Sequence, residues 1–254
     1  GRTSRWDRRS DDEIKKEAEK ALKKLNEVWQ RALEYHRIDS TLKASGKTSK
    51  LEYYPEMETL LPVVRGERTL LIEVNAANDI EAAIDWVADK EIDVVFTGLS
   101  EGWRKAEEIA KADIPAIVGP VLSIPNRAYD RYDKAYANPG ILQKAGVKVA
   151  IRSGDAENVR NLPYHAGFAA TYGMGKEEAL KAITIIPAEI FGVADKLGSL
   201  EKGKSATLFV TDGDPFETKT QVQYVFIEGW MIPLESRHTK LYDEFLDRQP
   251  GVEK

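Results

Sequence analysis

The segment Leu70-Leu71-Ile72-Glu73-Val74 decides the fold, because it is the first of four short apolar segments that alternate with longer amphipathic ones. The spacing predicts strands over residues 70–74, 92–96, 115–119 and 147–151, and helices over residues 80–88, 102–112, 164–172 and 176–185. Asn138, Pro139 and Gly140 are expected to cap a short helix before the last strand. This alternation predicts right-handed βαβ units and a parallel sheet.

Four parallel strands do not close an eightfold barrel, so the expected fold class is α/β with half of a (β/α)8 TIM-like barrel. After residue 192 the pattern changes to period two. It predicts antiparallel strands over residues 206–211, 222–227 and 230–232, with a turn at Asp212-Gly213-Asp214-Pro215. A helix over about residues 235–246 is expected to follow this small β-sandwich portion.

The amino-terminal part is predicted to be a long amphipathic helix. Ser10 and Glu13 form a capping box, and apolar residues then recur at helical spacing to about Tyr35. The charged residues on this helix are interpreted as a solvated face, and residues 39–56 are expected to form a polar loop. The predicted domains are therefore the helix and loop (1–56), the half-barrel (57–192), and the β-sandwich portion with the final helix (193–254).

Composition excludes several classes of protein. The 254 residues are 42% hydrophobic and 31% charged, with a net charge of −5, which is typical of a soluble globular protein. No basic stripe favours nucleic acid, and no apolar run is long enough to span a membrane. The absence of cysteine excludes disulfides, thiolate metal ligands and a cysteine nucleophile. The start without methionine fits a processed or excised fragment, and the basic residues 1–9 do not form a secretory signal.

Several short segments between about residues 61 and 233 together resemble the amidohydrolase superfamily, in its branch similar to imidazolonepropionase. They are Val118-Gly119-Pro120, Ala137-Asn138-Pro139-Gly140, Asn161-Leu162-Pro163-Tyr164-His165-Ala166-Gly167, Pro187-Ala188-Glu189-Ile190-Phe191-Gly192 and Gly198-Ser199-Leu200-Glu201-Lys202-Gly203-Lys204. The resemblance implies a (β/α)8 barrel, with a β-sandwich built from both ends of the chain. It also implies hydrolysis of amide or cyclic amide C–N bonds, with one or two divalent metal ions at the carboxyl ends of the strands. This chain would supply the carboxy-terminal part, with the last four strands.

The metal ligands that the resemblance implies are mostly missing. The chain has three histidines, His36, His165 and His238, and no His-x-His pair. Where the fifth strand of the family carries a metal-binding histidine, this chain has Glu73, and where the sixth strand carries another it has Thr97. We therefore expect a degenerate metal site, with a divalent ion such as zinc bound if the family chemistry is retained.

Asp155 follows the last strand of the half-barrel, where the resemblance implies a catalytic aspartate. It could be a general base, or it could cap backbone amides in its loop. Glu73 could be a metal ligand, or it could pair with a nearby arginine or lysine. Both alternatives are left open.

Three further groups are candidates for substrate contact. His165 could contact substrate or shuttle a proton, or it could be hydrogen-bonded to backbone. Arg152, Arg160 and Asn161, with Asn158, could recognise a carboxylate or phosphate, or they could fix the structure of their loop. His36 is expected to cap the end of the first helix, where an imidazolium favours the carbonyl end of the helix dipole.

Two functional hypotheses follow. In the first, the chain is the carboxy-terminal part of a hydrolase that acts on C–N bonds of a small molecule. In the second, it is a non-catalytic binding or structural subunit that pairs with another chain. Both hypotheses expect a protein partner, either a second chain or the missing amino-terminal half, because half a barrel exposes the edges of its sheet.

Overall fold

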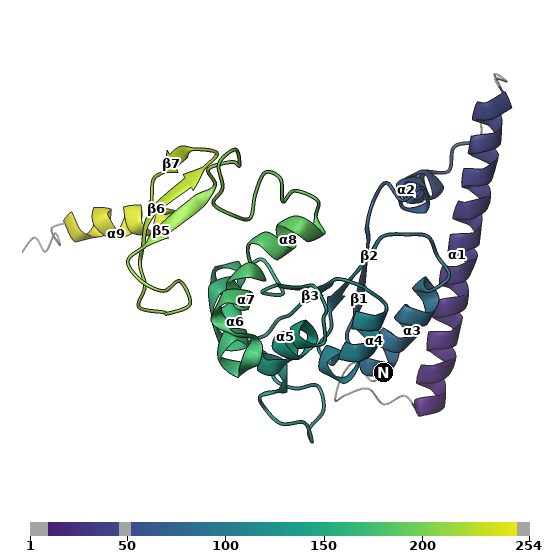
Figure 1. Cartoon of the computed structure of the whole chain (residues 1–254), viewed down its shortest axis with the longest axis horizontal. Helices are drawn as coiled ribbons and strands as arrows, with labels where there is room; N and C mark the ends of the chain where they lie inside the picture. Colours follow the sequence, from purple (N-terminus) through teal and green to yellow (C-terminus); the bar gives the residue numbers. More distant parts are fainter. Residues whose placement is uncertain (1–9, 46–51, 248–254) are drawn as a thin grey trace, which may run out of the picture.

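The structure is a computed structural model that describes residues 10–45 and 52–247. Two sheets carry the architecture: a four-stranded parallel sheet in the order β1-β2-β3-β4 and a three-stranded antiparallel sheet in the order β5-β6-β7 (Figure 1). The parallel strands are β1 (Leu70–Val74), β2 (Val94–Gly98), β3 (Ala116–Val118) and β4 (Val149–Ile151). The antiparallel strands are β5 (Leu208–Thr211), β6 (Val222–Ile227) and β7 (Trp230–Ile232). The predicted α/β fold class is confirmed.

The helices lie mostly between and beside the parallel strands. They are α1 (Asp11–Ser45), α2 (Pro55–Val64), α3 (Ala77–Val87), α4 (Ala106–Lys111), α5 (Lys134–Lys144), α6 (Leu162–Ala169), α7 (Lys176–Lys181), α8 (Ile185–Ile190) and α9 (Arg237–Asp247). Short 3-10 turns η1 (Gly102–Arg104) and η2 (Val159–Asn161) and a π-helical segment η3 (Ala170–Met174) join some of them. The described helices include none that is long and apolar enough to cross a membrane.

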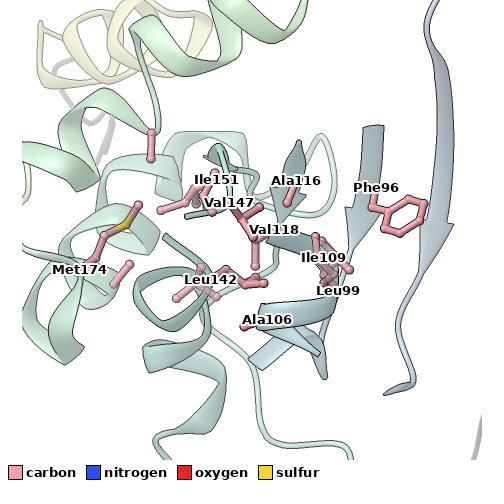
Figure 2. Packing of buried hydrophobic residues seen from close by; sticks show 14 of the residues in the cluster. Phe96, Leu99, Ala106, Ile109, Ala116, Val118, Leu142, Val147, Ile151 and Met174 are labelled. Carbon is pink, nitrogen blue, oxygen red and sulfur yellow. The ribbon is translucent and has the colours of Figure 1, made fainter. Parts of the chain in front are cut away.

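The parallel sheet buries one face under the helices. Successive residues of a strand point to opposite faces, and the register aligns Ile72 with Phe96, Phe96 with Ala116, and Ala116 with Val149. Figure 2 shows Val118 of β3 beside Leu142 and Ile109 from the covering helices, and Phe96 and Ile151 belong to the same buried cluster. Leu71 belongs to the opposite face of β1 and keeps 47% of its surface exposed. That face is the one that would point into the interior of a closed barrel.

The first helix is longer than the sequence predicts. It continues to Ser45 rather than ending near Tyr35, so the predicted loop over residues 39–56 is wrong for residues 39–45. Asp39 explains the extension, because its carboxylate accepts from Lys43 one turn later at 2.8 Å and from Arg65 at 2.7 Å. His36 is therefore inside the helix, beside Ser40, and not at its end. The predictions for residues 1–9 and 46–51 lie outside the described residues.

The structure also contains one helix that was not predicted and contradicts one further local prediction. Helix α2, which the sequence analysis missed, begins at Pro55 and contains Pro62. Proline has a low propensity for the interior of a helix, so the sequence of this segment does not predict one. Residues 138–140 do not cap a helix but lie in the middle of α5, where Asn138 and Gly140 are buried. The amide of Asn138 donates to the carbonyl of Leu99 at 2.7 Å, so tertiary contact outweighs the turn-forming tendency of this segment.

Candidate site at the carboxyl edge of the parallel sheet

The carboxyl edge is defined here as the ends of β1–β4 together with the loops that follow them. The register aligns Val74 with Gly98, Gly98 with Val118, and Val118 with Ile151. The four strands therefore end at the same level, and the residues that follow them meet at one edge of the sheet. In α/β barrels this edge is where binding and catalytic side chains gather.

Glu73 and Arg152 meet across the carboxyl edge, although 79 positions separate them in the chain. Arg152 Nη2 donates to Glu73 Oε1 at 2.8 Å, and Arg152 Nε donates to the carbonyl of Gly119 at 3.2 Å. The Glu73 side chain is 59% exposed and the Arg152 side chain 29% exposed. A guanidinium thus holds the carboxylate that the sequence analysis considered as a metal ligand. The neighbouring strand places buried Thr97 beside Glu73 in the register.

Asp155 lies in the exposed loop after β4 and is bonded to Asn158. Its Oδ1 accepts the Asn158 backbone N–H at 2.9 Å, and both of its oxygens accept from Asn158 Nδ2 at 3.0 Å. The hydrogen bonds from the Asn158 backbone and side-chain amides lower the pKa of Asp155, so the carboxylate is ionised at neutral pH. The same loop includes Asn161, whose amide reaches Asn158 Oδ1 at 3.4 Å.

Arg160 lies on another side of this loop. It lines a hollow of about 430 Å³ between the start of α6 and the antiparallel sheet, together with Tyr164, Phe209 and Val225. The structure therefore brings Glu73 and Arg152 together and links Asn158 to both Asp155 and Asn161, whereas Arg160 lines a hollow to which none of these groups contributes.

His165, on α6, is buried and anchors the loop after β3. Its Nδ1 accepts the backbone N–H of Val121 at 3.0 Å and of Leu122 at 3.2 Å. An imidazole nitrogen that accepts hydrogen bonds carries no proton, so the ring is neutral with its proton on Nε2. Burial lowers the pKa of His165, which favours the same neutral form.

We expect His165→Leu to lower the free energy of unfolding by about 2 kcal/mol, because two backbone N–H groups lose their acceptor. The pH dependence follows from the lowered pKa. The contribution of neutral His165 is fully present above the unfolded pKa of about 6.5 and is lost as the pH falls from there toward the folded pKa. Urea unfolding between about pH 7.5 and pH 5 measures this loss. His238→Leu, at an exposed position, should keep the wild-type slope, whereas an unchanged slope in His165→Leu would contradict the assignment.

Glu101 is a residue of the carboxyl edge that the sequence analysis missed. Its carboxylate is 4% exposed and accepts from Arg127 Nε at 2.5 Å and Nη2 at 2.7 Å, as well as from the backbone N–H of Ala77 at 3.0 Å. One carboxylate therefore ties together the loops after β1, β2 and β3. Burial, the largest influence, raises the pKa of Glu101, but the hydrogen bonds from Arg127 and Ala77 and the nearby positive charges outweigh it and hold the pKa below its usual value.

The loop after β3 has further attachments at the same place. Asn126 Nδ2 donates to Ser100 Oγ at 2.6 Å, and Arg104 forms an ion pair with Asp130. The guanidinium of Arg104 also lies over the ring of Trp103, 4.0 Å from its centroid. Little in the sequence distinguishes these residues from ordinary loop charges, because the ion-pair partner of Arg104 and the hydrogen-bond partner of Asn126 each lie 26 positions away.

The donor groups of the carboxyl edge do not fit a metal ion. Among the residues that the structure describes, no group of three or more His, Asp or Glu side chains could hold one. Glu73 is bonded to Arg152, Asp155 to Asn158, and Nδ1 of His165 to two backbone N–H groups. Each candidate ligand thus has a protein partner of its own.

Comparisons with known proteins match this chain to amidohydrolases. The model of the amidohydrolase family matches residues 132–232. Imidazolonepropionase from Shouchella clausii is 32% identical over 116 residues, which are 44% of this chain and 25% of that protein. An amidohydrolase from Thermotoga maritima has the same fold over 82% of this chain and 54% of its own, with a TM-score of 0.74 and 27% identity. The resemblance to the amidohydrolase superfamily, in its imidazolonepropionase-like branch, is confirmed.

Amidohydrolase tasK from Hapsidospora irregularis adds a second curated relative, 25% identical over 201 residues. Those residues are 72% of this chain but 20% of that protein, so the chain spans between about a fifth and a half of the length of these amidohydrolases. The matches together support a hydrolase of the amidohydrolase superfamily. They also agree with a partial barrel, since the solved amidohydrolase extends well beyond the part that matches.

Proposed function

We propose that this chain is the carboxy-terminal part of a hydrolase that acts on amide or cyclic amide C–N bonds. In this part, the carboxyl edge would contact the substrate rather than hold a metal ion. The observation that carries the proposal is the likeness to an amidohydrolase over 82% of the chain at 27% identity. We also propose the division of the chain into the helix and loop (1–56), the half-barrel (57–192) and the β-sandwich portion with the final helix (193–254).

Arg152 and Asp155 are the side chains that we propose to contact the substrate. The Arg152 guanidinium is held in place by Glu73 and by the Gly119 carbonyl, so it is oriented before a ligand arrives. Such a group favours a carboxylate or another planar anion on the substrate. Asp155 is exposed and ionised, so it can accept a proton during hydrolysis. Asn161 supports Asn158 beside it, and His165 holds the loop after β3 in position.

Amidohydrolases use a divalent metal ion to activate water, but the side chains of this carboxyl edge do not fit one. If the whole protein uses zinc, its ligands would come from residues beyond those described. That requirement points to a partner, either the amino-terminal half of the same protein or a second chain. The open edges of a four-stranded sheet favour such a partner for the same reason.

A second candidate function is a non-catalytic binding or structural subunit on an amidohydrolase scaffold. The Glu73–Arg152 ion pair favours it, because an arginine now neutralises the carboxylate at the place where the family holds its metal. In this case Arg152 and the surrounding loops would recognise a ligand or a partner without turnover.

Metal binding tests the account of the carboxyl edge that both candidates share, and turnover distinguishes the two. Equilibrium dialysis of the chain against zinc should give the same weak binding for the wild type and for Glu73→Gln, because Glu73 is already paired with Arg152. If the wild type binds one zinc ion per chain and Glu73→Gln abolishes that binding, the account of the carboxyl edge is contradicted.

Turnover should be tested on the complete protein with a panel of amides, lactams and cyclic ureas. Under the first candidate, Asp155→Asn should lower kcat by about 100-fold, the lower end of the range for a lost general base. The exposed Glu235→Gln variant should leave kcat unchanged. Absence of turnover in the wild type, with retained binding of these compounds, would favour the non-catalytic candidate.

A further inference from the structure

The amino-terminal half of α1 carries an apolar stripe that continues beyond the part of the helix that packs on the body of the protein. In the carboxy-terminal half, Ala32 and Tyr35 are buried against α2, and the Trp29 and Trp86 rings meet edge to face at 5.8 Å between centroids. Asn26 accepts from Trp86 Nε1 at 2.8 Å, close to where this contact begins. Figure 1 shows α1 as a straight rod along one side of the molecule.

The stripe has the spacing of a coiled coil. Ile14, Ala18, Ala21, Leu25, Val28, Ala32 and Tyr35 follow one another at alternating intervals of four and three residues. Its buried end packs within the molecule, but Ala18, Ala21 and Leu25 are exposed, with 45% of the surface of Leu25 accessible. Leu22 flanks the stripe and is 41% exposed. An apolar seam of this period is the face that one helix presents to another.

The charges beside the stripe favour a second copy of the same helix in antiparallel orientation. If Ala18 of one copy lies opposite Ala21 of the other, Ile14 comes opposite Leu25. Glu17 and Lys24 are both on the same side of the seam, so Glu17 of each copy then faces Lys24 of the other, twice by symmetry. A parallel pair would set Glu17 near Leu22 and Lys24 near Trp29, without opposite charges. The two central alanines permit a close approach of the helices.

We infer that this protein forms a symmetric dimer through residues 14–28 of α1, paired in antiparallel orientation. The surface is separate from the carboxyl edge of the sheet and does not depend on the proposed function. Because α1 is already folded on α2 and α3, pairing does not have to overcome the cost of nucleating a helix. The dimer would place two copies of the parallel sheet at the two ends of one helical pair.

Sedimentation velocity of the whole chain over a range of concentrations tests the dimer. The wild type should sediment with twice the monomer mass at high concentration. Ala21→Glu, at an exposed position, should raise the dimer dissociation constant at least about tenfold, because two carboxylates would be buried in the seam. Lys23→Glu, on the outer face of the helix, is the matched control and should leave the constant unchanged. Circular dichroism checks that each variant keeps its helix content.

A charge exchange tests the orientation. Glu17→Lys and Lys24→Glu should each weaken the dimer about fivefold, through two symmetry-related exposed ion pairs. The double variant should return to the wild-type constant, because the opposite charges again face each other. A wild type that remains monomeric throughout, or a dimer that Ala21→Glu leaves unchanged, would overturn the inference. If the double variant does not restore the dimer, the antiparallel pairing is overturned. If a different protein covers the stripe while the chain itself stays monomeric, the dimer is overturned.

Discussion

Arg127→Met should lower the free energy of unfolding by about 3 kcal/mol at pH 7, the lower end of the range for breaking a buried ion pair. The variant removes two hydrogen bonds to Glu101 and leaves that carboxylate buried, with the backbone N–H of Ala77 as its remaining hydrogen-bond donor. The lower end applies because the Arg127 side chain is 37% exposed and part of the interaction is screened by water. Urea unfolding of the whole chain measures the change.

The effect should depend on pH in a defined direction. The pKa of Glu101 is lowered in the folded protein, so its contribution is present above the unfolded pKa of about 4.3 and is lost as the pH falls toward the folded pKa. The difference between wild type and Arg127→Met should therefore shrink below about pH 4. Arg37→Met removes an ion pair with exposed Glu34 and serves as the control, with a change within about 0.5 kcal/mol. An equal loss in the two variants would show that Glu101 does not hold the three loops together.

Gly140→Ala should also cost about 3 kcal/mol, although alanine is the better helix former by about 1 kcal/mol. A Cβ at Gly140 would lie 2.7 Å from the backbone nitrogen of Met174 and 2.9 Å from its Cα. Backbone atoms cannot rotate away as a flexible side chain can, so α5 and the segment η3 would have to separate. Leu142 and Met174 belong to the same buried cluster, and their packing would loosen with it (Figure 2).

Thermal and urea unfolding measure this loss, with Lys144→Ala on the same helix as control. Lys144 is exposed, so its replacement should change the free energy of unfolding by less than about 0.5 kcal/mol. A neutral or stabilising Gly140→Ala would mean that helix propensity decides at this position and that α5 does not approach Met174 so closely. A Gly140→Ser variant should be at least as destabilising, since its Cβ meets the same backbone.

Local predictions succeed where the pattern of neighbouring residues determines the secondary structure. The apolar segments 70–74 and 147–151 contain β1 and β4, because a strand that packs in a core is favoured by a run of apolar, β-branched residues. They fail where a distant contact outweighs propensity. Residues 39–45 stay helical because Arg65, 26 positions away, binds Asp39, and Asn138 stays helical because Leu99 accepts its amide.

The candidate site divides in the same way. The sequence identified Glu73, Arg152, Asp155 and His165 as polar residues at or near strand ends, but it left two interpretations open for each. Their bonding partners depend on the tertiary fold, which brings Glu73 to Arg152 and the loop after β3 to His165. Glu101 had no sequence signal, because its partners lie in two other loops.

The amino-acid sequence by itself determined the alternation of strands and helices, the change to antiparallel strands after residue 192, and the relation to amidohydrolases. These depend on periodicity and on short segments, which are properties of neighbouring residues. Only the tertiary structure decided which charges meet at the carboxyl edge, how far α1 extends and which part of its stripe is covered. Those outcomes arise from contacts between residues that lie between 23 and 79 positions apart, and no local pattern encodes such a pairing.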